Sequence, residues 1–332
     1  MAEKPQLSVV IPVYNGERYL GKMLDSVLTQ TFSDFELFLV DNASTDKTGQ
    51  LMHTYAERDG RVRCLYQEKP GVSAARNAAL EICEGAYVMF LDGDDWIDEN
   101  YFEMFVAAME GVDLVSAGYR AYHEERIDGK THYTCFYESP KEGNEDFTAE
   151  RMLERLFEIR HYQGYVWNKC FRMEIIRQHR LRFHEDISYN EDRLFAVEYL
   201  ACARRARMLG ENRYHYILHE GNAVSAEYGE FPQEKEFTEI EAFSRMLSYL
   251  ADYPRALALA RKNMAQRELL LFGRMIDPHG FARYRKSRFR YHARRFRRLG
   301  YLPEDEREKK LCRKLIWYGW TGICYGQKEQ MD

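Results

Sequence analysis

Strand-like and helix-like segments alternate through the first 110 residues, and this rhythm restricts the fold more than any other feature of the sequence. Short apolar runs are separated by longer stretches whose apolar residues recur at helical spacing. The predicted strands are 7–13, 35–40, 62–66 and 87–91, and the predicted helices are 19–28, 44–58 and 73–83. Such alternation is typical of a mostly parallel sheet with helices on both faces.

The rhythm changes after residue 112. An antiparallel pair is expected at 113–122 and 131–137, because the Asp128-Gly129 sequence between them is a turn signal. Helices are then predicted at 148–160, 170–179 and 192–204, followed by a strand at 206–217. Beyond Pro232 almost every segment has helical spacing. We therefore expect an α/β domain over residues 1–226 and a helical C-terminal region over 227–332.

Composition excludes several classes of protein. The 332 residues are 45% hydrophobic and 30% charged, which permits a packed core and excludes global disorder. No apolar run reaches the roughly 18 residues of a membrane-spanning helix, and the N-terminal residues lack the pattern of a signal peptide. The seven cysteines are scattered and never spaced Cys-x-x-Cys, so neither a disulfide framework nor a zinc site is expected. The prediction is a cytoplasmic protein.

Charge is distributed unevenly. The net charge is −5, yet residues 283–298 contain no acid. The basic residues of this segment are Arg283, Arg285, Lys286, Arg288, Arg290, Arg294, Arg295, Arg297 and Arg298. An acidic body argues against a general nucleic-acid-binding protein. Aromatic residues interleave these charges and follow them, namely Tyr284, Phe289, Tyr291, Phe296, Trp317 and Trp320. This pattern favours peripheral attachment to an anionic membrane on its inner face; the alternative is a charged helix packed on its own body.

Acidic residues follow two of the predicted strands. Asp92, Asp94 and Asp95 crowd three carboxylates into four residues, and Asp41 ends another strand. Ligands of parallel α/β sheets bind at the carboxyl ends of strands, and divalent cations prefer oxygen ligands shared with phosphates. The alternatives are a solvated turn for the cluster and a helix cap for Asp41. Arg76, among small residues at a helix start, is either a phosphate ligand or a surface residue.

Several segments, in this order and at these intervals, resemble the motifs of glycosyltransferase family 2. They are residues 7–15, 40–46, 70–77 and 90–96. Residues 166–171 are similar to a Trp-Asn-Lys motif of the bacterial polysaccharide branch of that family, and 190–192, 214–216 and 222–225 continue the likeness. The resemblance is strong over 7–110, good in patches to about 226, and absent beyond.

The resemblance implies a GT-A fold, which is Rossmann-like with a mostly parallel sheet flanked by helices. It also implies a metal-dependent inverting glycosyltransferase of the hexosyltransferase class. The donor would be a nucleotide-sugar, for which we expect a UDP-linked one. The acceptor would be a glycan or a lipid-linked glycan in cell-surface polysaccharide assembly, and no nucleic acid is expected as a partner.

Site residues carried over from the family fall into two groups. On the nucleotide side, the resemblance places Pro12, Tyr14 and Asp41 around the base and Arg76 beside the base or the phosphates. Asp94 would hold the ribose or assist the metal, and Asp95 would ligate Mn²⁺ or Mg²⁺. The sequence departs from the family at Asn42-Ala43, where Asp-Gly is more usual, and at Gly93, which replaces a serine.

On the acceptor side, the resemblance makes Asp192 the general base and places Asn168 and Lys169 along the donor or acceptor side. Glu191 competes with Asp192, since helix neighbours point about 100° apart and only one can face a cleft. Both acids also suit a helix N-terminus without any catalytic role. His215 and His219 are candidate metal ligands, although a histidine on a strand is more often structural.

Two other functions compete with this one. Residues 16–22 match the spacing of a phosphate-binding loop, but Met23 stands where Ser or Thr should reach Mg²⁺, and Tyr19 and Leu20 belong to a helical stripe. The second competing function is that of a non-catalytic scaffold, which would bind a sugar or a nucleotide and have a glycosyltransferase-like fold. The acids Asp94, Asp95 and Asp192 argue against it.

Overall fold

The computed structural model describes residues 4–141, 143–158, 164–219, 232–276 and 286–321, except for the side chains of Lys286 and of 316–321. Contacts between residues divide the chain into two compact units. Unit 1 comprises Met1–Asp186 with Asn190–Ala226, and unit 2 comprises Ile187–Tyr189 with Glu227–Asp332. The segment 222–225 and the predicted boundary at 226 lie outside the described residues.

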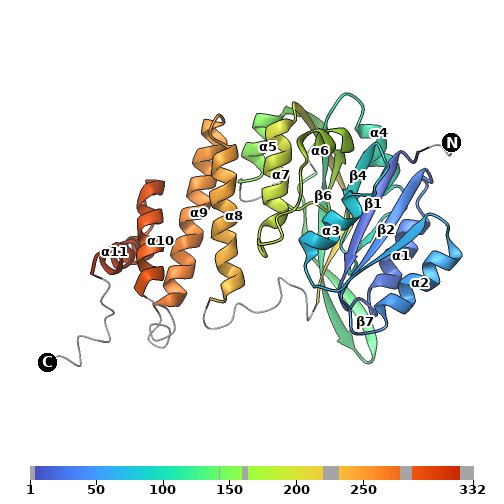
Figure 1. Cartoon of the computed structure of the whole chain (residues 1–332), viewed down its shortest axis with the longest axis horizontal. Coiled ribbons are helices and arrows are strands. Elements are labelled where there is room, and N and C mark those ends of the chain that lie inside the picture. Colours follow the sequence, from blue (N-terminus) through green and yellow to red (C-terminus); the bar gives the residue numbers. More distant parts are fainter. Residues whose placement is uncertain (1–3, 142, 159–163, 220–231, 277–285, 322–332) are drawn as a thin grey trace. The chain divides into compact units, whose positions relative to one another are not determined.

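Unit 1 is built on a ten-stranded sheet whose main path runs β3-β2-β1-β4-β9-β6-β10-β5 (Figure 1). β7 pairs with β6, and β8 pairs with β10. The strands are β1 Leu7–Val13, β2 Phe35–Asn42, β3 Val62–Gln67, β4 Tyr87–Phe90, β5 Trp96–Ile97, β6 Leu114–Ile127, β7 Lys130–Glu138, β8 Glu145–Thr148, β9 Lys169–Arg172 and β10 Arg205–Leu218. The predicted α/β architecture of GT-A type is confirmed.

Helices cover both faces of this sheet, with α1 and α2 on one side of β1 and β2 and α3 on the other (Figure 1). They are α1 Leu20–Leu28, α2 Thr48–Arg58, α3 Val72–Leu80, α4 Tyr101–Ala108, α5 Ala149–Arg155, α6 Met173–His179 and α7 Glu191–Cys202. The spacing predicted for α1 has its physical basis in the core, because Leu20, Met23, Leu24 and Val27 are all buried against the sheet. Since α1 begins at Leu20, the predicted phosphate-loop alternative is wrong: Lys22 lies over the Trp96 ring.

One predicted helix is partly a strand. The segment 170–179 divides into β9, which lies antiparallel between β4 and β6, and α6, which begins at Met173. Short apolar runs do not distinguish a buried strand from a buried helix by periodicity. The sheet decides the outcome here, because β9 provides hydrogen-bond partners to two strands that do not pair with each other.

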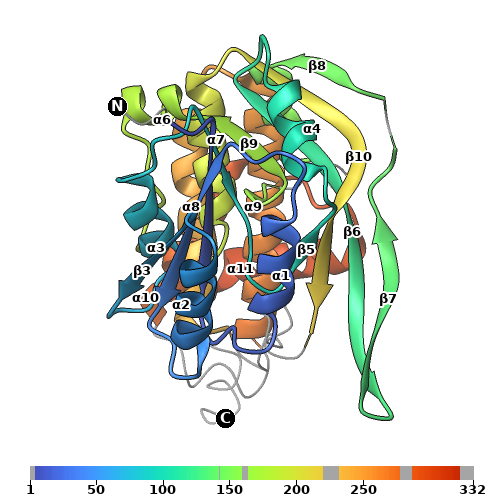
Figure 2. The same cartoon turned by 90° about the vertical axis from the view of Figure 1, so that its right-hand side faces the viewer.

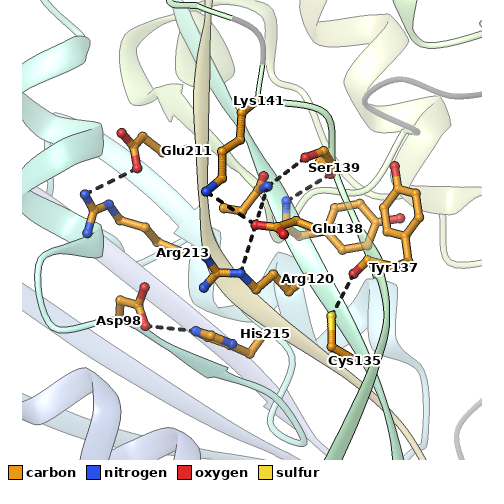
Figure 3. Close-up of polar contacts among 12 residues, drawn as sticks. Asp98, Arg120, Cys135, Tyr137, Glu138, Ser139, Lys141, Glu211, Arg213 and His215 are labelled. Carbon is orange, nitrogen blue, oxygen red and sulfur yellow. Dashed lines mark hydrogen bonds and ion pairs between the residues drawn. The ribbon is translucent and has the colours of Figure 1, made fainter.

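The predicted antiparallel pair is confirmed, and β6 and β7 form a long hairpin (Figure 2). Side-chain contacts tie its base to β10. The Asn212 amide donates to the Ser139 carbonyl at 2.7 Å and to Glu138 at 3.2 Å, and Arg120 donates to Glu138 at 3.1 Å (Figure 3). Asn212 packs so closely on Gly118 that a Cβ there would meet its Oδ1 at 1.9 Å. A larger residue at position 118 would therefore have to displace Asn212 and Ser139.

Strand direction brings several chain segments to one edge. β1, β2, β3 and β4 run parallel, β9 runs opposite to both β4 and β6, and β10 is parallel to β6. The carboxyl ends of β2, β4 and β10 therefore lie along the same edge of the sheet. Asp41, Asp92 and His219 stand at these three ends. This is the edge where α/β sheets bind ligands.

Unit 2 is helical in its described part, as predicted. It contains α8 Glu234–Tyr249, α9 Pro254–Met275, α10 Lys286–Leu299 and α11 Glu306–Thr321. α9 begins at Pro254. Proline is tolerated there because the N–H that it lacks would have no partner within the helix at that position. The core includes Leu269, Phe272, Phe289, Phe296 and Leu315. No helix in the described part of the chain is both long and apolar enough to cross a membrane.

The membrane hypothesis loses part of its basis in this unit. Phe289 and Phe296 are only 2% and 4% exposed and pack into the core of unit 2, so neither is available to enter a bilayer. Tyr291 is exposed. Six further residues of that prediction lie outside the description, namely Arg283, Tyr284 and Arg285 and the side chains of Lys286, Trp317 and Trp320.

Candidate active site

Arg76 is the centre of a cluster of acids at the carboxyl edge of unit 1. Its guanidinium is only 3% exposed and contacts three carboxylates, with Nη1 at 2.5 Å from Asp192 and 3.3 Å from Glu191, and Nη2 at 3.3 Å from Asp92. The ring of Phe183 lies 5.2 Å from the guanidinium carbon. The guanidinium charge faces these acids, and the predicted place of Arg76 beside the base or the phosphates stays a prediction.

Protonation in this cluster follows from burial. Burial first, and the neighbouring Asp192 carboxylate second, raise the pKa of Glu191 to about 8, against the opposing effect of Arg76. Glu191 therefore carries a proton at neutral pH. Burial likewise raises the pKa of Asp92, with Arg76 opposing the shift. Two of the three acids facing Arg76 are thus biased toward their neutral forms.

Asp94 meets a histidine from the far end of unit 1. His219 Nε2 lies 3.0 Å from Asp94 Oδ2, and the Tyr19 ring stacks on the His219 ring with centroids 4.0 Å apart. A carboxylate oxygen and an imidazole nitrogen are donors that Mn²⁺ accepts. The described residues contain no group of three or more candidate ligands. This pair fits a divalent cation whose other positions are taken by substrate phosphate and water.

Asp95, predicted as a metal ligand, contacts the sheet. Its side chain is fully buried, Oδ2 accepts a hydrogen bond from the Tyr214 hydroxyl at 2.5 Å, and Oδ1 accepts one from the Ile217 amide at 2.8 Å. Asp95 therefore fastens the acidic turn to β10. Its metal-binding role stays a prediction, and Asp94, also named as a metal residue, faces the histidine.

The two candidate histidines have different environments. His215 Nε2 lies 2.8 Å from Asp98 (Figure 3). Its Nδ1 lies 3.1 Å from the Tyr122 hydroxyl, and its ring stacks on Trp96. Burial lowers the pKa of His215, so it is neutral and structural. His219 is the one that reaches the acidic turn.

The residues predicted around the nucleotide base lie at the ends of β1 and β2. Pro12 is buried opposite Val40, Tyr14 is 58% exposed, and Asp41 Oδ1 accepts a hydrogen bond from the Ser44 amide at 2.9 Å. The departure at Asn42 has a structural explanation. Asn42 Oδ1 accepts from the Gly71 amide at 2.7 Å and so connects β2 to the start of α3.

Asn168 and Lys169 are fully buried in unit 1. The Asn168 amide donates to the Ala117 carbonyl at 2.9 Å, and Lys169 Nζ donates to the Tyr165 carbonyl at 2.6 Å and to Asn168 Oδ1 at 2.9 Å. Burial lowers the pKa of Lys169 to about 7. These contacts hold both side chains within the fold, and their predicted position along the donor or acceptor side stays a prediction.

The sequence assigned no individual role to two residues at this edge. Asp92 is predicted only as one of the strand-end acids, whereas in the fold it follows β4 and is one of the three acids that contact Arg76. Tyr214 was part of a matching motif, but only the fold shows that its hydroxyl holds Asp95. Strand-end position was the available signal for Asp92; none existed for Tyr214.

An open α/β sheet with acids, an arginine and a histidine gathered at its carboxyl edge defines a Rossmann-like protein whose ligand site lies at that edge. Residues 8–178 match the model of glycosyl transferase family 2. The chain belongs to that family, as the motifs of its strand ends suggested.

Relatives agree with this assignment. The chain is 33% identical over 217 residues to the uncharacterized glycosyltransferase EpsJ of Bacillus subtilis, covering 64% of this chain and 61% of EpsJ. It is 30% identical over 230 residues to the glycosyltransferase GlyA of Streptococcus pneumoniae, covering 65% of this chain and 31% of GlyA. The chain thus spans less than two thirds of the length of these relatives.

Solved structures support the fold. The crystal structure of residues 1–349 of Staphylococcus aureus TarS in complex with UDP has a TM-score of 0.64 at 20% identity, covering 96% of this chain and 93% of that one. The complex of TarS 1–349 with UDP-GlcNAc has a TM-score of 0.61 at the same identity and coverage.

Proposed function

We propose that the protein is an inverting, metal-dependent glycosyltransferase that moves a sugar from a UDP-linked donor to a glycan or lipid-linked glycan in cell-surface polysaccharide assembly. The observation that carries the proposal is the cluster in which Arg76 holds Asp192 beside Asp92, next to the Asp94–His219 pair. Support comes from the relatives: one is named a poly(ribitol-phosphate) β-N-acetylglucosaminyltransferase, and another a teichoic acid biosynthesis protein.

Donor binding is assigned to the ends of β1, β2 and β4. Tyr14 and Asp41 border the base, and Asp94 with His219 would hold Mn²⁺ or Mg²⁺ on the diphosphate. When bound, such a cation neutralises the charge that develops on the departing diphosphate. Residues 1–226 form the catalytic domain in this proposal, and residues 227–332 form a helical extension. The protein would act on the cytoplasmic side of the membrane.

Proton removal is assigned to Asp192. Its carboxylate takes the proton of the acceptor hydroxyl as that oxygen attacks the anomeric carbon, and the sugar–phosphate bond breaks. One displacement inverts the anomeric centre, so a single base suffices. Arg76 fixes the position of Asp192 and compensates its charge. The raised pKa of Glu191 favours its protonated form at neutral pH, which favours Asp192 as the base.

A donor screen tests this function. Purified protein is incubated with UDP-linked and GDP-linked sugars, with Mn²⁺ or with EDTA, and released nucleoside diphosphate is measured. We expect slow metal-stimulated release of UDP from one UDP-sugar, which Asp94→Asn removes. Tight binding of UDP without release from any donor, even with glycan acceptors present, would contradict the proposal and favour the non-catalytic scaffold.

A further inference from the structure

A hollow of about 770 Å³ lies in unit 2, lined by residues of α8, α9 and α10. Five of its eleven lining residues are arginines, and among these described lining residues none is acidic. The arginines are Arg261, Arg290, Arg294, Arg295 and Arg298. Below we call this hollow the arginine groove.

Four of these arginines form no ion pair within the part of the chain that the structure describes. Several other arginines of unit 2 are paired with glutamates, as Arg288 is with Glu234 at 2.6 Å and Arg274 is with Glu236. By contrast, four arginines of the groove are exposed and form no ion pair with an acid of the described residues. They are Arg261, Arg290, Arg294 and Arg298. The groove is therefore a local cationic surface on a chain whose net charge is −5.

Three of the four recur at intervals of four residues along α10. Arg290, Arg294 and Arg298 occupy one side of the helix, about 6 Å apart along its axis given a rise of roughly 1.5 Å per residue. Like charges at this spacing destabilise a helix. A regular row of exposed guanidinium groups complements a ligand whose negative charges recur at a similar interval.

Arg295 anchors the floor of the groove. It is 13% exposed, donates to the Tyr291 hydroxyl at 2.5 Å and the Ile240 carbonyl at 2.7 Å, and also contacts Ser244. These contacts fix the walls before any ligand arrives. Guanidinium groups bind phosphate oxygens in a bidentate manner, so phosphate is the anion that this lining suits best.

A bilayer is a poorer match for the same surface. The groove is concave, and the aromatic residues on the opposite side of α10, Phe289 and Phe296, are buried in the core of unit 2. Single-stranded nucleic acid would also need stacking surfaces for its bases. The described lining offers a single aromatic ring, that of Tyr291, whose hydroxyl is bonded to Arg295.

We propose that the arginine groove binds an extended glycan chain with repeated phosphate diesters, and that this chain is the acceptor. Arg290, Arg294 and Arg298 each contact a phosphate, and Arg261 contacts the chain from α9. The identity of the chain as acceptor rests on the proposed function, whereas its binding does not.

Binding of inorganic polyphosphate to the full-length protein tests the groove. Calorimetry should detect binding that weakens as salt rises, and inorganic phosphate should bind far more weakly because a single anion gains nothing from the row. The triple variant R290Q/R294Q/R298Q should bind polyphosphate at least about tenfold more weakly, since three charged contacts are lost. The matched control R307Q/R313Q/K314Q, which removes three exposed charges of α11, should bind like the parent.

Release of UDP separates this proposal from the catalytic one. Both triple variants should release UDP from the donor at the parent rate, because their substitutions lie in unit 2. Equal polyphosphate binding by the parent and R290Q/R294Q/R298Q would overturn the proposal. So would tighter binding to a DNA oligonucleotide of equal phosphate number, or to phosphatidylglycerol vesicles. If the parent binds polyphosphate through these arginines but releases no UDP, the binding groove is supported and its role in acceptor binding is contradicted.

Discussion

Arg76 Nη1 lies 2.5 Å from Asp192 Oδ1, although 116 residues separate the two in the chain. Arg76 belongs to α3 and Asp192 to the first turn of α7. The contact joins the strand-end half of the site to the helix that carries the proposed base. The first three predictions below follow from it.

Asp192→Asn keeps the shape of the side chain and removes the proton acceptor. We expect transfer to fall by about 10²-fold or more, which is the usual loss for a general base. UDP binding should stay near the parent value, since Asp192 is not assigned to the nucleotide. Steady-state transfer and calorimetry of UDP measure the two effects. If Glu191→Gln abolished transfer and Asp192→Asn did not, the base would be Glu191.

Glu191→Gln should change how stability depends on pH. The pKa of Glu191 is raised to about 8 in the folded protein and is ordinary when unfolded, so the folded state holds its proton more tightly. The parent therefore loses stability as pH rises from about 4.5 to about 8. Glutamine cannot ionise, so the Tm of the variant relative to the parent should increase over this interval and level off above it. A constant difference between pH 5 and 9 would contradict the shift.

Arg76→Gln should destabilise unit 1. It leaves three partly buried acids without their cation, and breaking such a pair costs about 3–5 kcal/mol. Chemical unfolding at pH 7 measures the loss. The control is Lys47→Gln, which breaks an exposed pair with Glu17 and should cost less than about 1 kcal/mol. Equal losses for both variants would mean that the cluster contributes no more than a surface pair.

Asp94 and Asp95 should behave differently although they are neighbours. Asp94→Asn should remove Mn²⁺ stimulation and leave stability near that of the parent. Asp95→Ala should cost about 1–3 kcal/mol of stability, because it leaves the Tyr214 hydroxyl and the Ile217 amide without their buried acceptor. Metal titrations of UDP release and thermal unfolding distinguish them. A stable Asp95→Ala protein without a metal response would support Asp95 as the ligand.

The histidines give a paired test of the metal site. His219→Ala removes the nitrogen that faces Asp94, so we expect weaker Mn²⁺ stimulation of UDP release. His215→Ala removes the contact of β10 to Asp98, which directly follows β5, and should leave the metal response unchanged while lowering stability. Manganese titrations of the two proteins measure this. The reverse pattern would place the metal elsewhere.

The sequence by itself determined the elements of the sheet and most of the helices. Leu7–Val13 is a strand with the predicted bounds, and α1 buries the predicted stripe, because hydrophobic periodicity is a local property that each segment carries alone. It also indicated the strand-end acids, since parallel strands place their carboxyl ends on one edge. The sequence predicted helix where β9 lies, because this segment is a strand only through its pairing with β4 and β6.

Only the tertiary structure decided which side chains meet. Asp94 and Asp95 are adjacent in sequence, yet one faces His219 and the other is buried against Tyr214, because successive side chains after a strand point in different directions. Arg76 and Asp192 come together through the packing of α3 and α7, and the arginines of α10 form a groove only beside α8 and α9. Spacing along a chain carries no information about such distances, which are set by how the elements pack.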